Sequence, residues 1–418
     1  MRGNISLLKN LSKGKFRNFW LTQVFVLIAI QFYFISLSWM TLDLTGSTVL
    51  LGTLLTITAV PRLIIMPIGG ALADIISPSK LLMINILLLF FSSLFFTFTM
   101  YFGYLEIWML VVFSIIFGIS TALFLPTSFS IIPKLVNESR LQSANSLAQL
   151  GLQLSTSIGP ALAGVIISLF GLPSIYLTIT IFFIISLLFS LAIGHIETDN
   201  QDRNNLSFKG VFVDIVDGIK IVRGIPLLIA LIFISALLNI SVIGPQQIGL
   251  PYIAQTSLEG GAHNLGFIMS ALGAGTLVGA LLIGLLNNIK SPIIIAFSVA
   301  VVLGGIWSLV GVYQNKLAVI STILFFSGVC IGVLNVLILT LIQRKTPKNA
   351  IGRVMSLQLL GSTGIQPVSF LIVGWLLDII SVTTLFILSG LIISITSLVS
   401  LISKNIRQPD INAKSRAL

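Results

Sequence analysis

The chain alternates between long apolar runs and short polar segments along almost its whole length. A helix that crosses the hydrocarbon core of a membrane needs about 20 consecutive, mainly apolar residues. The first run is too long for a cleavable signal peptide and leads directly into the second, so we expect it to stay in the protein as a helix. Runs of this length predict twelve spanning helices, at roughly 17–42, 48–73, 79–101, 107–131, 143–170, 173–194, 226–250, 264–287, 291–313, 317–342, 353–377 and 382–402.

Composition supports the same fold class. Hydrophobic residues make up 56% of the chain, charged residues only 8%, and the mean hydropathy is +1.09. A soluble protein with so few charges would expose large apolar patches, so lipid must surround most of this chain. We therefore predict an all-α, multi-pass membrane protein. Its single cysteine, Cys330, falls inside the tenth predicted helix, which excludes a disulfide and a cysteine-based metal site.

The distribution of positive charge predicts the topology. The net charge of +11 could indicate a nucleic-acid partner. However, every Lys and Arg except Arg62 and Lys316 falls in a segment on the same side of the twelve predicted helices. Cytoplasmic segments of membrane proteins carry such an excess of Lys and Arg. We therefore expect both termini in the cytoplasm, the lipid bilayer as the surroundings, and no nucleic-acid partner.

A polar stretch at 195–225 divides the chain into two halves of six helices. In this stretch Phe208, Phe212, Ile215, Ile219 and Val222 share one helical face, which predicts an amphipathic helix on the inner membrane surface. The predicted organisation is a basic tail (1–16), an N-terminal bundle (17–194), a cytoplasmic loop (195–225), a C-terminal bundle (226–402) and a second tail (403–418).

The two halves have related sequences. The segment with Pro133-Lys134, Arg140 and Ser146-Leu147 in the first half recurs in the second as Pro347-Lys348, Arg353 and Ser356-Leu357. A duplicated six-helix unit is a known architecture of membrane transporters. The pattern therefore favours two six-helix pseudo-repeats.

Small residues recur every four positions in two of the predicted helices. Such faces allow helix backbones to approach closely in lipid, so we expect helices 5 and 8 to pack together through them. The residues in helix 5 are Gly151, Ser155, Gly159 and Ala163, and those in helix 8 are Ala271, Gly275 and Gly279. In helix 5, Pro160 follows Gly159, and Gly164 lies four residues beyond Pro160.

Several segments resemble the major facilitator superfamily, and in particular an efflux branch that includes macrolide efflux proteins and enterobactin-type siderophore exporters. The resemblance implies the major facilitator fold, with a substrate site at the midplane between the halves. It also implies alternating access in exchange for protons, without a cofactor. The segments that carry it are Leu42-Asp43-Leu44-Thr45-Gly46-Ser47, Gly69-Gly70-Ala71-Leu72-Ala73-Asp74, Gly159-Pro160-Ala161-Leu162-Ala163-Gly164, Asp214 to Pro226, and Gly352-Arg353.

The same resemblance implies a cytoplasmic gate formed by Asp74, Lys80, Arg140 and Arg353. The positive-inside rule alone would account for the three cations, but it gives no reason for an acid at Asp74. The turn at 75–79 departs from the family pattern, because Ser77-Pro78-Ser79 stands where basic and glycine residues are expected.

Arg62 is the most informative single residue, because it falls near the middle of the second predicted helix. An Arg at the centre of a bilayer costs about 2.5–3.5 kcal/mol on insertion scales, so it normally faces protein or a water-filled cavity. No Asp or Glu is predicted at the same depth. Arg62 could bind an anionic group of the substrate or help in coupling. It could instead bind backbone carbonyls freed by Pro61, or polar side chains of helix 1.

Other polar residues in the predicted helices are candidates for the cavity. Each could instead form a hydrogen bond between helices. Asp43 is a candidate for proton coupling at the outer end of helix 1, although Asp is also common in turns. The candidates for substrate contact are Gln31, Tyr33, Thr121, Asn239 and Asn335, with Gln149 and Gln366.

The sequence contains no glycine-rich phosphate loop, nucleophile–base pattern or metal-ligand spacing, so we expect neither an enzyme nor a metal site. We predict a monomeric secondary active exporter in a bacterial plasma membrane. It would move a siderophore-like anionic or polar metabolite in exchange for protons. A multidrug or macrolide efflux pump is the alternative, and a non-transporting receptor or scaffold is a remote one.

Overall fold

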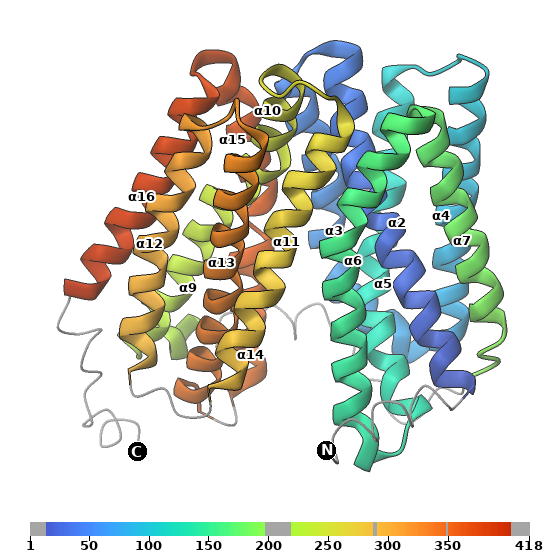
Figure 1. Ribbon diagram of the computed structural model, residues 1–418. Helices are drawn as coiled ribbons and strands as arrows, with labels where there is room; N and C mark the ends of the chain where they lie inside the picture. The colour runs from blue at the N-terminus through green and yellow to red at the C-terminus, as the bar shows by residue number, and fades with distance from the viewer. Residues whose placement is uncertain (1–13, 197–218, 287–290, 348–349, 403–418) are drawn as a thin grey trace. The chain divides into compact units, whose positions relative to one another are not determined.

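The computed structural model describes residues 14–196, 219–286, 291–347 and 350–402, without the side chains of 66–75 and 125. All regular structure in these ranges is helical (Figure 1), and 12 of the helical segments are long and apolar enough to cross a membrane. The predicted fold class and the number of spanning helices are therefore confirmed. The two tails and most of the predicted amphipathic helix lie outside the described residues.

Two compact units make up the fold. Unit 1 comprises residues 1–206 together with 259–270, and unit 2 comprises 207–258 and 271–418. In unit 1, α2 packs against α6 and α7, α3 packs against α5, and α4 packs against α5 and α7. Its elements are α2 (Gly14–Thr45), α3 (Thr48–Ile75), α4 (Pro78–Tyr101), α5 (Ile107–Leu135), the short η1 (Glu138–Arg140), α6 (Leu141–Phe170) and α7 (Leu172–Leu191).

Unit 2 contains the other spanning segments, two of which are irregular. The seventh span, Pro226–Thr256, contains two π-helical turns, and the eleventh, Ile351–Ile379, is interrupted at Gly364. The elements are α9 (Pro226–Leu238), η3 (Asn239–Ile243), η4 (Pro245–Gly249), α10 (Leu250–Thr256), α11 (Ala262–Leu285, whose first turns belong to unit 1), α12 (Pro292–Val312), α13 (Leu317–Lys345), α14 (Ile351–Thr363), α15 (Gln366–Ile379) and α16 (Val382–Ile402).

The helix boundaries repeat between the halves of the chain. Both α5 and α13 contain 29 residues, and they begin at Ile107 and Leu317. These two starting positions differ by 210 residues. The first residues of α6 and α14, and those of α7 and α16, also differ by 210 residues. Ser146 and Ser356 are also 210 residues apart, so they occupy equivalent positions in the two halves. Pro133 and Pro347 do not, because Pro133 lies inside α5 whereas Pro347 follows the end of α13. The sequence pairing of these two prolines was therefore wrong.

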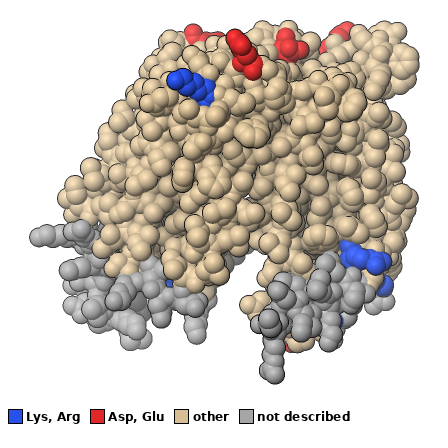
Figure 2. All heavy atoms as spheres, viewed as in Figure 1, with Lys and Arg blue, Asp and Glu red and all other residues tan. Residues whose placement is uncertain are grey.

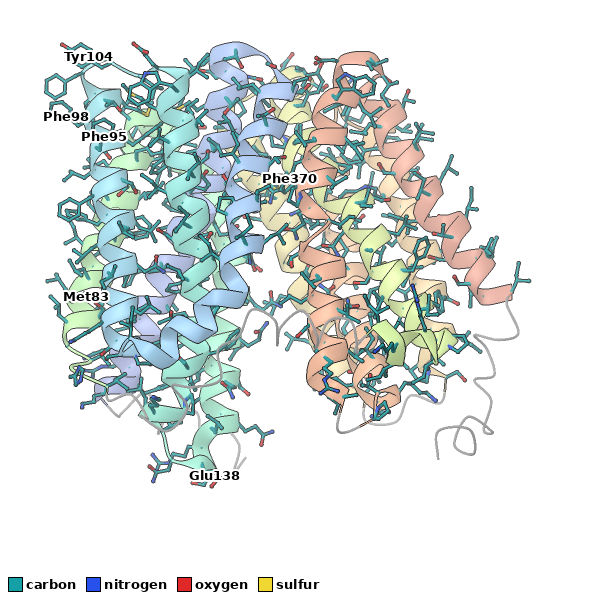
Figure 3. All side chains as sticks on the ribbon, turned by 180° about the vertical axis from the view of Figure 1, so that it is seen from behind. Met83, Phe95, Phe98, Tyr104, Glu138 and Phe370 are labelled. Atoms are coloured by element: carbon teal, nitrogen blue, oxygen red, sulfur yellow. The ribbon has the colours of Figure 1, made fainter. Side chains whose placement is uncertain are left out.

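The flanks of the helices carry apolar side chains. On the face shown in Figure 2, Lys, Arg, Asp and Glu lie near helix ends and the surface between is free of them. Phe95, Phe98 and Tyr104 project outward from unit 1 (Figure 3), and each is more than half exposed, at 54%, 55% and 67%. Such exposure suits hydrocarbon and the interfacial region rather than water.

The small residues of α6 contact two helices within unit 1. A Cβ atom on Gly151 or Gly159 would meet Trp20 and Gln31, respectively, so both glycines face α2. Gly164 faces the first turns of α11, where a Cβ would lie 3.0 Å from the Cα of Gly266. Close to this contact, Pro160 lies inside the helix, and the Ser270 hydroxyl accepts a hydrogen bond from the N–H of the next residue, Ala161, at 2.8 Å.

The small residues of α11 have a different partner from the one expected. A Cβ on Gly275 would collide with the backbone of Phe325, and one on Gly279 with that of Val329. Both belong to α13, whose own glycines, Gly328 and Gly332, face back to α11. Helices 5 and 8 do contact each other, at Gly164 and Gly266, but the prediction that Gly275 and Gly279 form this contact was wrong. These two glycines face helix 10, whose glycines have a complementary spacing.

The contact between α12 and α16 gives a direct test of this packing. A Cβ on Gly304 would collide with the Ser394 hydroxyl and the Gly390 carbonyl, whereas nothing lies within 4 Å of one on Gly305. We expect Gly304→Ala to destabilise the protein by about 1–3 kcal/mol, as overpacking does. Melting of the detergent-solubilised protein measures this. Gly305→Ala is the matched control, and equal melting temperatures for the two variants would contradict the packing.

Candidate functional site

Arg62 lies in the middle of α3 and has no partner among the described residues. Its Nε atom is buried and has no hydrogen-bond partner. The rest of its guanidinium forms neither a hydrogen bond nor an ion pair with the described residues. Thr58, one turn earlier on the same face of α3, packs against Gly118 of α5. Arg62 thus lies on the same face of α3 as a residue packed on α5, and it is partly buried.

Tyr33 lies in a helix interface and not in a cavity. It is fully buried, and its hydroxyl forms hydrogen bonds with Thr58 at 2.9 Å and Ser114 at 3.2 Å. Its ring stacks on Phe117 with a centroid separation of 3.6 Å. These contacts join α2, α3 and α5. In this conformation Tyr33 fixes three helices to one another, so we remove it from the candidates for substrate contact.

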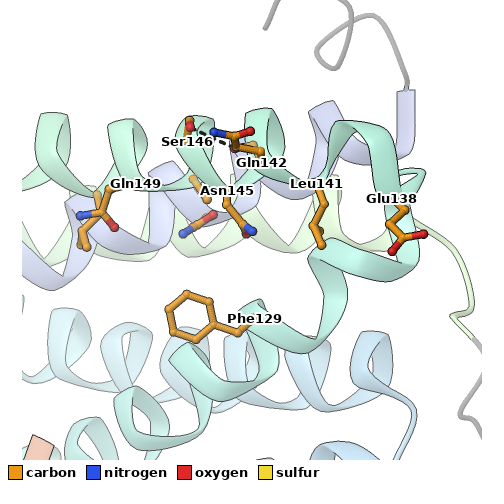
Figure 4. Close-up of a pocket in the computed structure, with 10 residues that line it drawn as sticks. Phe129, Glu138, Leu141, Gln142, Asn145, Ser146 and Gln149 are labelled. Carbon is orange, nitrogen blue, oxygen red and sulfur yellow. Dashed lines mark hydrogen bonds between the residues drawn. The ribbon is translucent and has the colours of Figure 1, made fainter. Parts of the chain in front are cut away.

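Unit 1 contains a cavity of about 840 Å³, lined by α2, α5, η1 and α6. In Figure 4, Leu141 and Asn145 of α6 and Glu138 of η1 point toward the side from which Phe129 of α5 projects. The lining is a mixture of amides and apolar side chains. It comprises Gln23, Phe129, Glu138, Leu141, Gln142, Asn145, Ser146, Ala148, Gln149 and Leu152.

Four amide side chains of this cavity make no hydrogen bond to the described part of the chain. Gln142, Asn145 and Gln149 are exposed, whereas Gln23 is only 6% exposed. The Oε1 atom of Gln23 is buried without a partner. An unpaired buried acceptor costs about 1–3 kcal/mol, so a molecule that donates a hydrogen bond to Gln23 would recover this energy.

Unit 2 has a smaller cavity of about 340 Å³, lined by α9, η3, α13 and α14. Gln358 donates from Nε2 to the Ser235 hydroxyl at 2.6 Å, while its Oε1 is buried and unpaired. Asn239 donates to the Ser235 carbonyl at 2.9 Å and accepts a long contact of 3.5 Å from Gln366. The lining comprises Ser235, Leu238, Asn239, Asn335, Ile338, Leu339, Met355, Gln358, Leu359 and Ser362.

The structure brings some of the predicted site residues together and separates others. Gln149 lines the cavity of unit 1, and Asn239 and Asn335 line that of unit 2. Gln31 instead packs on Gly159, and Thr121 donates to carbonyls of its own helix. The candidates predicted from the sequence did not include Gln23, Asn145 and Gln358. The spacing of Asn145 and Gln149, one helical turn apart, was the available signal.

The predicted gate is only partly described. The side chain of Asp74 lies outside the described residues, Lys80 is exposed, Arg140 ends η1, and Arg353 is exposed in the first turns of α14. Asp43 is exposed near the end of α2. The gating and coupling roles of these residues therefore stay predictions.

The turn between α3 and α4 binds the segment that follows α7. The Ser77 hydroxyl donates to the carbonyl of Ile196 at 2.7 Å, and the N–H of Ile196 donates to the Ser79 hydroxyl at 3.1 Å. Ser77 and Ile196 are both buried, at 8% exposure. The serines that depart from the family pattern thus satisfy both backbone groups of one residue.

Comparison with known proteins identifies the family. The sequence profile of the Major Facilitator Superfamily matches residues 19–369. The chain belongs to this superfamily. It is therefore a transporter rather than an enzyme, and a multi-pass protein of the plasma membrane.

Relatives within the major facilitator superfamily include efflux proteins. The chain is 22% identical to macrolide efflux protein A of Streptococcus pyogenes over 401 residues, which cover 96% of this chain and 98% of that protein. It is 29% identical to the staphyloferrin A transporter of Staphylococcus aureus over 158 residues, or 38% of this chain and 40% of that protein.

Solved structures show the same fold. A bacterial homologue of the iron transporter ferroportin, in an inward-facing state, aligns with a TM-score of 0.71 at 15% identity and covers 93% of this chain and 99% of that one. A D-xylose–proton symporter aligns with a TM-score of 0.69 at 14% identity, covering 92% and 96%. At this identity the likeness concerns the fold alone.

The cavity of unit 1 predicts a difference in chemical accessibility. In a Cys330→Ser background, Asn145→Cys should react readily with a maleimide, because Asn145 is exposed to the cavity. Ala148→Cys, on the same helix but only 6% exposed, should react much more slowly. Labelling rates followed by mass spectrometry test this, and equal rates would contradict the difference in exposure between these two lining residues.

The contact of Ile196 also predicts an effect on stability. Replacing both Ser77 and Ser79 by Ala leaves two backbone groups of Ile196 without these partners, which costs about 1–3 kcal/mol for a buried group. We expect a lower melting temperature in detergent. Ser92→Ala removes a hydroxyl that bonds only within its own helix and serves as the control. A double variant that melts like this control would refute the role of the two serines.

Proposed function

We propose that this transporter exports a small organic metabolite that carries anionic and hydrogen-bonding groups, of the siderophore kind. The protein would work as a monomer, by alternating access and in exchange for protons, with both termini in the cytoplasm. The similarity to macrolide efflux protein A supports the direction of transport, and the distribution of Lys and Arg supports the orientation.

The observation that carries the choice of substrate is the unpartnered guanidinium of Arg62. A cation within a spanning helix that pairs with no described residue is a ready partner for a carboxylate or another anionic group. The described Asp and Glu residues all lie at helix ends or in loops. A cationic drug would therefore lack a counter-ion in the described spanning segments, whereas an anionic metabolite would have one.

The amides of the two cavities support a polar substrate. Asn145 and Gln149 in unit 1, and Asn239 and Asn335 in unit 2, can each donate or accept hydrogen bonds. Among the carboxylates, we propose Asp43 for proton coupling, because its exposure at the end of α2 leaves it free to exchange protons with water.

Macrolide efflux is the second candidate. It is favoured by the match to macrolide efflux protein A, which extends over 96% of this chain, whereas the match to the staphyloferrin A transporter covers 38%. The apolar residues that separate the amides in both cavities would suit a molecule with a large apolar surface.

Mass spectrometry of spent medium and cell pellets tests the first candidate. A deletion strain grown without iron should lose an iron-binding metabolite from the medium and accumulate it inside the cells. Wild-type protein should restore secretion, and Arg62→Ala should lower it at least tenfold, because a charged hydrogen bond is worth about 1.5–3 kcal/mol. Lys316→Ala, an exposed cation before α13, is the matched control.

Other results of these secretion experiments would contradict parts of the proposal. Equal secretion by wild-type and deletion strains would overturn the metabolite proposal, and increased macrolide susceptibility of the deletion strain would then place efflux of those drugs first. Export that survives Arg62→Ala without change would remove the argument for an anionic group.

A further inference from the structure

The two cavities are built at equivalent positions of the internal repeat. Half of the residues that line the cavity of unit 1 have a counterpart in the lining of the cavity of unit 2. In each pair the two residue numbers differ by 210, as for 129 and 339. The counterparts lie on the helix pairs α5 with α13 and α6 with α14, which begin at the same interval. The pairs are Phe129 with Leu339, Asn145 with Met355, Ala148 with Gln358, Gln149 with Leu359, and Leu152 with Ser362.

The polarity of these positions is exchanged between the units. In α6 the polar residues are Asn145 and Gln149, and their counterparts in α14 are apolar. In α14 the polar residues are Gln358 and Ser362, and their counterparts in α6 are apolar. Among the paired positions, each helix therefore has one polar row with a spacing of four residues; Gln142 and Ser146 of α6 also line the cavity of unit 1 but have no counterpart in the lining of unit 2. The row in α14 is displaced by three residues, or about 4.5 Å along the helix.

Each cavity also contains one buried amide oxygen that accepts no hydrogen bond from the described residues. These are the Oε1 atoms of Gln23 in unit 1 and Gln358 in unit 2. The nitrogen of Gln358 is already bonded to Ser235, so its amide is oriented with the oxygen as the free group. A buried acceptor without a donor is unfavourable, and hydroxyl or N–H groups are the chemistry that would satisfy it.

We propose that Gln23, Asn145 and Gln149 in unit 1 and Gln358 in unit 2 determine substrate specificity by binding hydroxyl or N–H groups. Because the polar rows lie at different positions, each unit offers a different pattern of hydrogen-bonding groups. This inference rests on the proposed transport function, but it does not depend on the role of Arg62.

Transport by purified protein in proteoliposomes tests it, with staphyloferrin A and erythromycin as probes. For the probe that wild-type protein moves, Asn145→Met with Gln149→Leu gives α6 the side chains of α14 at those positions and should raise KM about tenfold or more. Adding Met355→Asn and Leu359→Gln should not restore KM, because the amides then lie in the other unit. Gln153→Leu, on α6 but outside the cavity lining, is the matched control.

A second variant separates recognition from folding. Gln23→Leu removes a buried oxygen that has no described partner, so the melting temperature should stay equal or rise while KM increases about tenfold. A structural role would instead lower the melting temperature.

The outcomes distinguish this inference from the proposed function. Wild-type transport that is unaffected by the Asn145, Gln149 and Gln23 variants would overturn the specificity proposal alone. Recovery of KM on moving the amides to unit 2 would overturn the claim that their position matters. Failure of wild-type protein to move either probe would overturn both the proposed function and this inference.

Discussion

The need to satisfy every backbone N–H and C=O group inside lipid governs this structure, because hydrocarbon offers no hydrogen bonds in return. A continuous helix meets this need within its own segment. Where a helix is interrupted, a neighbour must provide the missing partner. Ser270 accepts from the N–H of Ala161 beside Pro160, and the Ser369 hydroxyl donates to the Ile240 carbonyl in the π-helical part of the seventh span at 2.7 Å. These bonds also fix which helices lie together.

Close approach of helices is the second consequence of a lipid environment. Burial from water cannot drive apolar helices together there, so dispersion contacts and backbone proximity must do so. The glycines at Gly275 and Gly328 show the requirement, because each faces the backbone of the other's helix at a distance that excludes a side chain. Gly304 and Gly390 repeat it between α12 and α16. Rigid helix pairs of this kind provide a framework on which polar residues can be placed accurately.

Function arises from what differs between two similar frameworks. The repeat places the same helices, at the same intervals, around a cavity in each unit. Along α5 with α13 and α6 with α14 the backbone positions correspond, so the difference between these helices at the cavities lies in the side chains. In unit 1 the amides of Asn145 and Gln149 alternate with apolar residues, and in unit 2 Gln358 and Ser362 occupy the complementary positions. A molecule with unevenly distributed polar groups would meet a different pattern in each unit.

The sequence by itself determined the spanning helices, their number and the fold class, because the length of an apolar run and the thickness of a bilayer are linked directly. It also singled out Arg62, since a charge within such a run is conspicuous. Only the tertiary structure decided which glycine faces which helix, because a small residue permits close approach without specifying a partner. It likewise showed that Tyr33 is buried between helices, that Gln23 borders a cavity, and that Gln358 has a free acceptor. Those distinctions depend on distances between helices far apart in the chain, which the periodicity of a single helix does not contain.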